Sequence, residues 1–69
     1  MKIKTPMTTE DGEQIRLLRQ KQGLTQARVA HELGLTQAAV SQIENGTPQS
    51  LPALIKVCDF FGIEVEVDR

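Results

Sequence analysis

The pentapeptide Gly-Leu-Thr-Gln-Ala occurs twice in this chain, at residues 23–27 and again at residues 34–38. Glycine often ends a helix because it adopts a positive φ at no steric cost, and threonine caps a following helix by accepting a hydrogen bond from its first turn. The repeat therefore predicts a helix over residues 26–33, a turn at Gly34 and another helix from Gln37. Two helices joined by so short a turn cross at a steep angle, which is the helix-turn-helix arrangement.

The flanking segments carry signals for two more helices. A helix is expected over roughly residues 9–22, and either Thr8 or Thr9 can cap it. The helix that begins at Gln37 extends to about residue 45. A fourth helix begins after Ser50 and runs to about residue 61. We expect it to bury an apolar stripe of five side chains: Leu51, Leu54, Ile55, Cys58 and Phe61.

Composition sets limits on the kind of protein. The 69 residues suffice for one small domain, and a single cysteine and a single histidine exclude an internal disulfide and a Cys/His zinc site. Cys58 is expected in the core, and His31 outward without a metal. No nucleophile–base pair or phosphate-cradling glycine loop is present, so we expect no enzyme, no metal and no cofactor. The net charge of −1 and pI of about 5.7 argue mildly against nucleic acid, since most DNA-binding domains are basic.

The C-terminal segment alternates β-branched and acidic residues, which is typical of a half-buried strand. A strand needs a partner for its backbone groups. The weak N-terminal arm, Lys2–Thr5, is one candidate, a frayed tail is an alternative, and we favour a copy of the same strand in a second subunit. Under that expectation residues 1–8 are an arm, residues 9–62 the helical domain and residues 63–69 a dimerisation strand with three inward side chains: Ile63, Val65 and Val67.

Eight residues at fixed spacing complete a known signature: Gln26, Ala30, Gly34, Val40, Ser41, Glu44, Asn45 and Gly46. With these residues the chain resembles the phage repressor and Cro-type family, also called the XRE family. Its terminal strand is similar to that of HipB-like antitoxins, whose dimers pair C-terminal strands. The resemblance implies an all-α, four- to five-helix, lambda repressor-like DNA-binding domain with a C-terminal β-strand that pairs across a dimer.

In this family the third helix lies in the major groove of DNA, with its outward side chains at the base edges. Those positions here are uncharged: Gln37, Ala38, Ser41, Gln42 and Asn45. Glutamine can bind adenine through two hydrogen bonds, and an alanine methyl can contact a thymine methyl. The alternative is an ordinary solvated helix face, which usually contains Glu and Lys.

We expect a second group of residues to contact phosphates: Arg16, Lys21, Thr25, Gln26, Arg28, Thr47 and Gln49. By resemblance, the amide of Gln26 can also brace Gln37. The alternative is that Gln26 is merely a residue well suited to an early position of its helix. Lys2 and Lys4 on the arm are weaker candidates. Because no Lys or Arg lies between Arg28 and Lys56, the salt dependence of DNA binding should be shallow.

The family often contains a buried ion pair at the positions of Arg19 and Glu44. The resemblance therefore predicts that this pair links the first helix to the end of the third and orients the DNA-contacting helix. Two independent surface charges are the alternative.

The function that follows is a homodimeric, sequence-specific repressor on a palindromic operator, and the antitoxin and autorepressor of a toxin–antitoxin pair. The expected partners are double-stranded DNA, a second copy of the chain and a toxin protein, with no membrane. The expected location is the cytoplasm, in association with the nucleoid. One alternative is a protein-interaction module that neutralises a toxin without significant DNA reading, and another is a helix-turn-helix fold used only for protein contacts.

Overall fold

Six elements follow one another in the computed structural model, which describes residues 1–67. They are β1 (Lys2–Lys4), α1 (Thr9–Lys21), α2 (Gln26–Leu33), α3 (Gln37–Glu44), α4 (Leu51–Phe60) and β2 (Glu64–Glu66). The four predicted helices are present, each ending within one residue of its expected boundary. The last two residues of the predicted 63–69 strand lie outside the described part of the chain. Within residues 1–67 no helix is long and apolar enough to cross a membrane.

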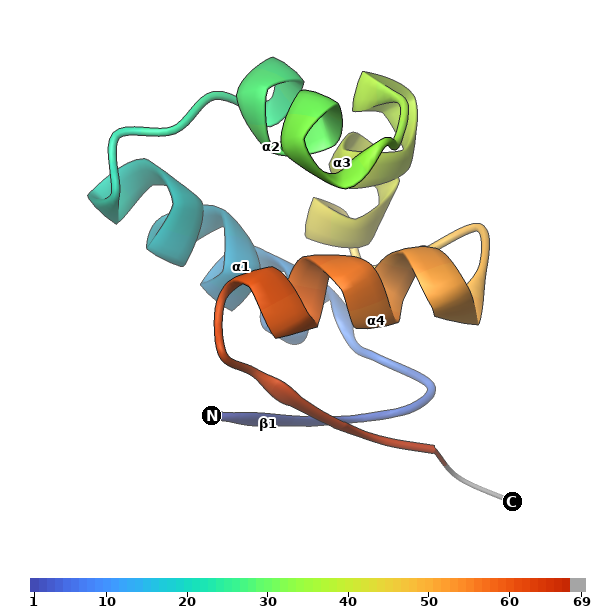
Figure 1. Cartoon of the computed structure of the whole chain (residues 1–69). Coiled ribbons are helices and arrows are strands. Elements are labelled where there is room, and N and C mark those ends of the chain that lie inside the picture. The colour runs from blue at the N-terminus through green and yellow to red at the C-terminus, as the bar shows by residue number, and fades with distance from the viewer. Residues whose placement is uncertain (68–69) are drawn as a thin grey trace.

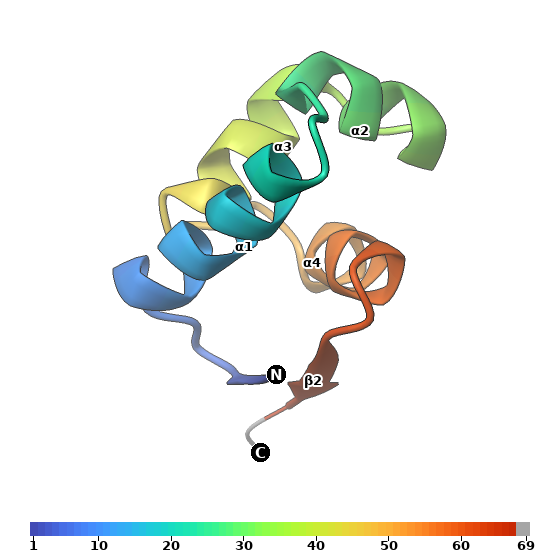
Figure 2. The same cartoon turned by 90° about the vertical axis from the view of Figure 1, so that its left-hand side faces the viewer.

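The helices are arranged so that α2 and α3 lie at one end of the molecule and the two strands at the other, with α1 and α4 between them (Figures 1 and 2). Local capping defines where each helix starts. The hydroxyl of Thr8 accepts a hydrogen bond from the Asp11 N–H, and the Asp11 carboxylate accepts one from the Thr8 N–H, which makes a reciprocal capping box. Ser50 caps α4 by accepting a hydrogen bond from the Ala53 N–H at 3.2 Å.

The C-terminal strand pairs with the N-terminal arm of its own chain. β1 and β2 run parallel, with Lys2 beside Glu64 and Lys4 beside Glu66. The arm is a better partner than its weak alternation suggested because Ile3 is fully buried and the lysines face the glutamates, with Lys2 Nζ 3.1 Å from Glu66 Oε2. A hydrogen bond to Glu66 raises the pKa of Lys2. The expectation that favoured a second subunit over the arm is therefore wrong for this edge of β2.

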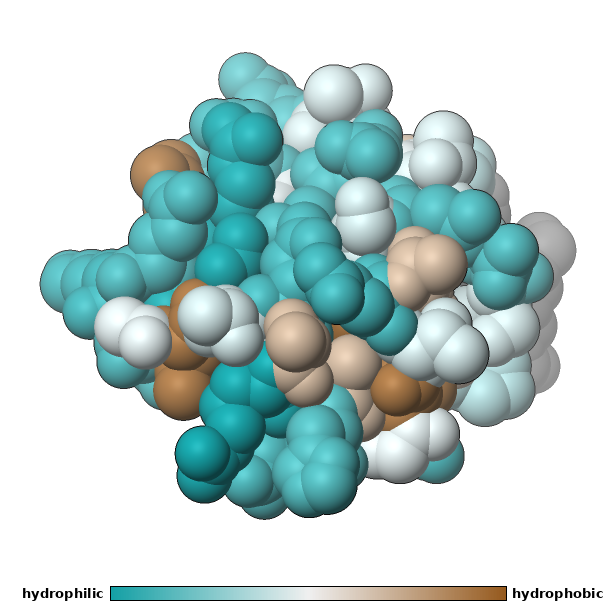
Figure 3. Space-filling view, turned by 90° about the horizontal axis from the view of Figure 1, so that it is seen from above, coloured by the Kyte–Doolittle hydropathy of each residue, from teal (hydrophilic) through white to brown (hydrophobic). Residues whose placement is uncertain are grey.

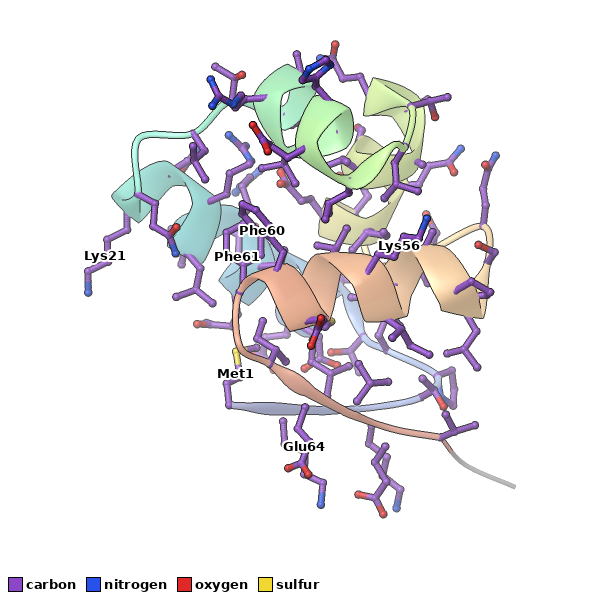
Figure 4. All side chains as sticks on the ribbon, in the orientation of Figure 1. Met1, Lys21, Lys56, Phe60, Phe61 and Glu64 are labelled. Carbon is purple, nitrogen blue, oxygen red and sulfur yellow. The ribbon has the colours of Figure 1, made fainter. Side chains whose placement is uncertain are left out.

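The position of the sheet also corrects the expectation for the arm. Figure 1 places β1 on the side of α4 that is opposite α3, and Figure 4 shows Glu64 pointing away from the helices on that side. Lys2 and Lys4 are therefore not beside the proposed DNA-contacting helix, and both belong to the charged outer face of the sheet.

The core divides into two clusters that share half-buried side chains. The larger joins the sheet, α1 and α4, whereas the smaller, between α2 and α3, contains just Val29, Ala30 and Val40 as buried residues. The expected stripe on α4 is partly wrong: Leu51 is 38% and Ile55 44% exposed. The buried residues of α4 are Ala53, Leu54, Val57 and Cys58. The buried face therefore includes the small Ala53 and Val57 in place of the expected Leu51 and Ile55.

The N-terminal half of α1 crosses the end of α3 at very short range. A Cβ atom at Gly12 would lie 2.5 Å from the Glu44 carbonyl oxygen and 2.7 Å from that of Ile43. At Gly46, whose φ is +85°, a Cβ would lie 2.7 Å from the Thr9 Cα. Both positions therefore require glycine, and together they bring the end of α3 against α1.

We expect Gly12→Ala to destabilise the fold, although helix propensity alone would favour alanine by about 1 kcal/mol. The added methyl would overlap two backbone carbonyls, and such overpacking costs about 1–3 kcal/mol. Urea denaturation measures the free energy of unfolding, with Gln14→Ala on the exposed face of α1 as the control, expected within about 0.5 kcal/mol of wild type. A Gly12→Ala protein that is more stable than wild type would contradict the close crossing.

Candidate nucleic-acid interface

The turn between α2 and α3 is built from the repeated pentapeptide. Thr25 accepts a hydrogen bond from the Arg28 N–H at 3.0 Å, and Thr36 accepts one from the Ala39 N–H at 3.1 Å, so each threonine caps one helix. Gly34 has a φ of +68°, and the Leu35 N–H donates to the Ala30 carbonyl at 2.8 Å. The side chain of Ala30 is buried where α2 meets α3. The local sequence thus orients α3 relative to α2.

The predicted base-contacting residues lie on the side of α3 that faces away from its buried residues. Gln37, Ala38 and Asn45 are exposed, whereas Ser41 and Gln42 are half-buried; these five side chains are called the outward stripe below. The stripe contains no charged side chain. Figure 3 looks onto the end of the molecule where α2 and α3 lie, and hydrophilic colours cover most of that face.

Gln42 differs from the rest of the outward stripe. Its Oε1 atom is buried and has no hydrogen-bond partner. The main-chain oxygen of the same residue accepts hydrogen bonds from the N–H of Thr47 at 2.9 Å and from its hydroxyl at 3.4 Å. These bonds hold the start of the α3–α4 loop against the end of the stripe.

A buried ion pair joins α1 to the end of α3. Arg19 and Glu44 are 8% and 4% exposed, and Arg19 donates from Nε to Glu44 Oε2 at 2.6 Å and from Nη2 to Oε1 at 3.0 Å. The third nitrogen, Nη1, donates to the main-chain oxygen of Leu24 at 2.7 Å. The pair expected between Arg19 and Glu44 is thus present, and it also holds the turn that precedes α2.

Gln26 contributes to the same network. Its Nε2 donates to Glu44 Oε1 at 3.1 Å, so the side chain contacts Glu44 rather than bracing Gln37 as the resemblance implied. A weak signal for this bond was present at the sequence level, because a buried carboxylate has more acceptor capacity than one arginine fills. The second N–H of the amide and the main-chain N–H at the start of α2 remain the groups of Gln26 suited to a phosphate.

The remaining phosphate candidates are distributed around this end of the molecule. Arg16 pairs with Glu13, and Arg28 pairs with Glu32 at 2.9 Å, both in exposed or half-exposed positions where an ion pair is weak and exchangeable. Lys21 projects from the end of α1 (Figure 4). Thr25 is occupied as a cap, Thr47 contacts Gln42, and Gln49 is exposed in the loop.

The residues with reactive side chains form no further site. Cys58 is fully buried, and burial, with a smaller contribution from Asp11, raises the pKa of its thiol to about 11. His31 is exposed on α2. The described part of the chain has no cluster of three His, Cys, Asp or Glu side chains that would hold a metal ion.

We expect Glu44→Ala to lower the free energy of unfolding by about 3–5 kcal/mol, because it leaves the Arg19 guanidinium buried without a counter-charge. The double variant Arg19→Met/Glu44→Met should recover most of that loss, since a buried ion pair replaced by apolar side chains is often neutral. Urea denaturation measures both, and Glu32→Ala, which breaks the exposed pair with Arg28, is the control at less than about 1 kcal/mol. A loss below 1 kcal/mol for Glu44→Ala would show that the pair is effectively solvated.

Comparisons with known proteins agree with this geometry. A helix-turn-helix family model, HTH_3, matches residues 15–67. A search of curated proteins gives no match. Among solved structures, a chain of the HipA–HipB–O2–O3 complex is similar at 27% sequence identity and a TM-score of 0.74, over 100% of this chain and 96% of that chain.

These comparisons confirm the expected lambda repressor-like fold and the resemblance to the XRE family and its HipB-like members. The matched residues 15–67 include α2 and α3, the two short helices that meet at Gly34. The chain therefore belongs to the XRE-type helix-turn-helix family, and it is a DNA-binding regulator rather than an enzyme.

Proposed function

We propose that this chain is a sequence-specific repressor that binds a palindromic operator as a homodimer and reads it with the outward stripe of α3. The observation that carries the proposal is an exposed, uncharged helix face held in place by the buried Arg19–Glu44 network. A helix face that merely meets solvent has no need of so many buried contacts behind it.

The side chains of the outward stripe suit base edges in the major groove. Gln37 is exposed and stands at the first position of α3, where its amide can donate to and accept from adenine. The methyl group of Ala38 suits a thymine methyl, and the shorter Ser41 and Asn45 suit bases that lie closer to the helix. Phosphates would be bound by the start of α2 at Thr25 and Gln26 and by Thr47 and Gln49 in the loop.

The electrostatic contribution to binding should be small. Each subunit has three Lys/Arg side chains among its phosphate candidates, Arg16, Lys21 and Arg28, and two of these already have acidic neighbours. If all three neutralise phosphates, the slope of log K against log salt is about −3 for one subunit and about −5 for a dimer. Affinity then depends on joining two subunits across two half-sites about one helical turn apart.

We expect the protein to bind the DNA upstream of its own gene in a gel-shift assay, and Gln37→Ala to weaken that binding by about 1–3 kcal/mol per subunit. Gln14→Ala, an exposed glutamine of α1 outside the stripe, is the matched control and should bind like wild type. Equal affinity of the wild-type protein for this DNA and for random DNA at low salt would end the repressor proposal. It would favour the alternative of a protein-interaction module.

The dimer proposal now depends on the second edge of β2. The Glu64 N–H and the Glu66 carbonyl bond to the β1 side, so the N–H and carbonyl of Val65 face the opposite edge. That edge has no neighbouring strand among residues 1–67. An antiparallel, two-fold pairing centred on Val65 would satisfy both groups and bring Ile63, Val65 and Val67 of two subunits together in a four-stranded sheet.

Val65→Pro tests this edge selectively, because proline removes the N–H at the centre of the proposed pairing with the second subunit and leaves the bonds to β1 in place. We expect a wild-type sedimentation mass of about twice the 7.6 kDa of the chain, and the monomer mass for Val65→Pro. Val65→Ile keeps the N–H and should stay dimeric. A dimer that survives Val65→Pro would place the subunit interface elsewhere.

We further propose that the chain is the antitoxin of a toxin–antitoxin pair, supported by its similarity to HipB, which occurs in a complex with HipA. Co-expression with the product of the neighbouring gene should give a stable complex in size-exclusion chromatography. Gln37→Ala should still form that complex, because it removes base contacts and leaves the rest of the surface unchanged. If no complex forms, the antitoxin proposal fails while the repressor proposal stands.

A further inference from the structure

The outer face of the two-stranded sheet has one basic strand and one acidic strand. β1 places Lys2 and Lys4 on this face, β2 places Glu64 and Glu66 there, and all four side chains are exposed. In the register of the sheet Lys2 lies beside Glu64 and Lys4 beside Glu66, and Lys2 Nζ is 3.1 Å from Glu66 Oε2. Figure 4 shows Glu64 pointing away from the helices. Within one chain, the charges of these four side chains therefore balance.

The open edge of β2 determines which residues of a second subunit would meet these charges. The main-chain groups of Glu64 and Glu66 bond to the β1 side, so the groups on the open edge belong to Val65 and its odd-numbered neighbours. In any antiparallel pairing through those groups, odd-numbered residues oppose odd-numbered ones and even-numbered residues oppose even-numbered ones. The pairing centred on Val65 therefore sets Glu64 opposite Glu66 of the partner subunit, and two-fold symmetry repeats this contact.

The spacing of the strands ranks the charge interactions across such an interface. In the strand order β1-β2-β2-β1, opposed glutamates are about 5 Å apart, a lysine is about 10 Å from the partner's β2, and the two β1 strands are about 14 Å apart. Charge interactions decay over about 8 Å at physiological ionic strength. Repulsion between glutamates is therefore the strongest individual interaction, and repulsion between lysines is the weakest. The attraction of each lysine to the partner's glutamates is the interaction that offsets the repulsion.

We infer that Lys2 and Lys4 are counter-charges for homodimerisation, which they promote without touching the second subunit; the inference rests on the proposed dimer and deepens it. Without the two lysines, dimerisation would bring four uncompensated carboxylates together on one face, and like charges directly opposite each other destabilise a strand pair. With them, each subunit contributes two positive and two negative charges to that face. The pKa of Lys2 is raised by Glu66 and, to a smaller extent, by Glu64, so this ammonium group already interacts with both carboxylates of its own chain.

Sedimentation equilibrium in 150 mM NaCl tests the inference by giving the dimer dissociation constant of each variant. Lys2→Gln/Lys4→Gln should weaken the dimer about 2- to 10-fold, which is the effect of losing several screened attractions across about 10 Å. Adding Glu64→Gln and Glu66→Gln to that variant should restore the wild-type constant to within about 2-fold, because the repulsion between carboxylates is then removed as well.

The variant with all four amides also separates a role in dimerisation from a role in holding the arm. It lacks the Lys2–Glu66 ion pair just as the lysine variant does, so a weakened attachment of β1 would impair both dimers equally. Recovery of the dimer would therefore be specific to repulsion across the interface. In 1 M NaCl, where screening leaves a range of about 3 Å, the lysine variant should regain the wild-type constant without any second substitution.

Lys21→Gln/Arg28→Gln is the matched control, because it removes two positive charges at the end of α1 and on α2, away from the sheet (Figures 1 and 4). It should dimerise like wild type. A loss of the same size in this control would overturn the inference, since the effect would then come from net charge alone.

Two further results would overturn the inference while the proposed dimer stands. One is unchanged dimerisation of Lys2→Gln/Lys4→Gln, and the other is a loss that neither 1 M NaCl nor the added glutamate substitutions reverse. A wild-type protein that is monomeric at every concentration would overturn the inference and the dimer proposal together. In that case the gel shift with Gln37→Ala still decides whether the outward stripe reads DNA.

Discussion

The carboxylate of Glu44 is the contact on which the arrangement of the helices depends. It accepts hydrogen bonds from Arg19 on α1 and from Gln26 at the start of α2, while it stands itself at the last position of α3. Arg19 also donates a hydrogen bond to the main-chain oxygen of Leu24, which lies between α1 and α2. Desolvation offsets much of the attraction between buried charges, so the network contributes little net stability. Its effect is geometric, because each bond is satisfied in one relative placement of the three helices.

The two core clusters show why a polar network has this role. The α2–α3 cluster has three buried residues of modest size, and apolar contacts of that kind are non-directional. The larger cluster holds α1, α4 and the sheet together but reaches α3 mainly through Ile43. The close crossing at Gly12 and Gly46 provides the missing constraint at the same end of α3 as Glu44. The ion pair and the close backbone crossing thus both position the end of α3, where few apolar side chains are buried.

Much of the helical fold was predictable from the sequence because its signals are local. Thr25, Thr36 and the glycines define helix ends through bonds within a few residues, and these boundaries agree with the structure. The pairing of β1 with β2 spans more than 60 residues, and the arm offers three residues of weak alternation. The complementary charges of Lys2 and Lys4 with Glu64 and Glu66 were a signal for it that alternation alone does not show. The phase of α4 was misjudged because Leu51 and Ile55 are larger than the buried Ala53 and Val57.

The candidate site was predictable to a different degree, since its residues came from helix phase and the ion pair came from a family resemblance. Helix phase places Gln42 on the outward stripe but says nothing about which end of its amide is buried. The uncharged stripe also makes precise placement of α3 more important than it is for a basic helix. Charges attract phosphates over several ångströms, whereas a hydrogen bond to a base edge weakens within a few tenths of an ångström and with modest misalignment. Under the proposed function, reading DNA through amides and hydroxyls would therefore require a well-defined position of α3, which the hydrogen bonds to Glu44 favour.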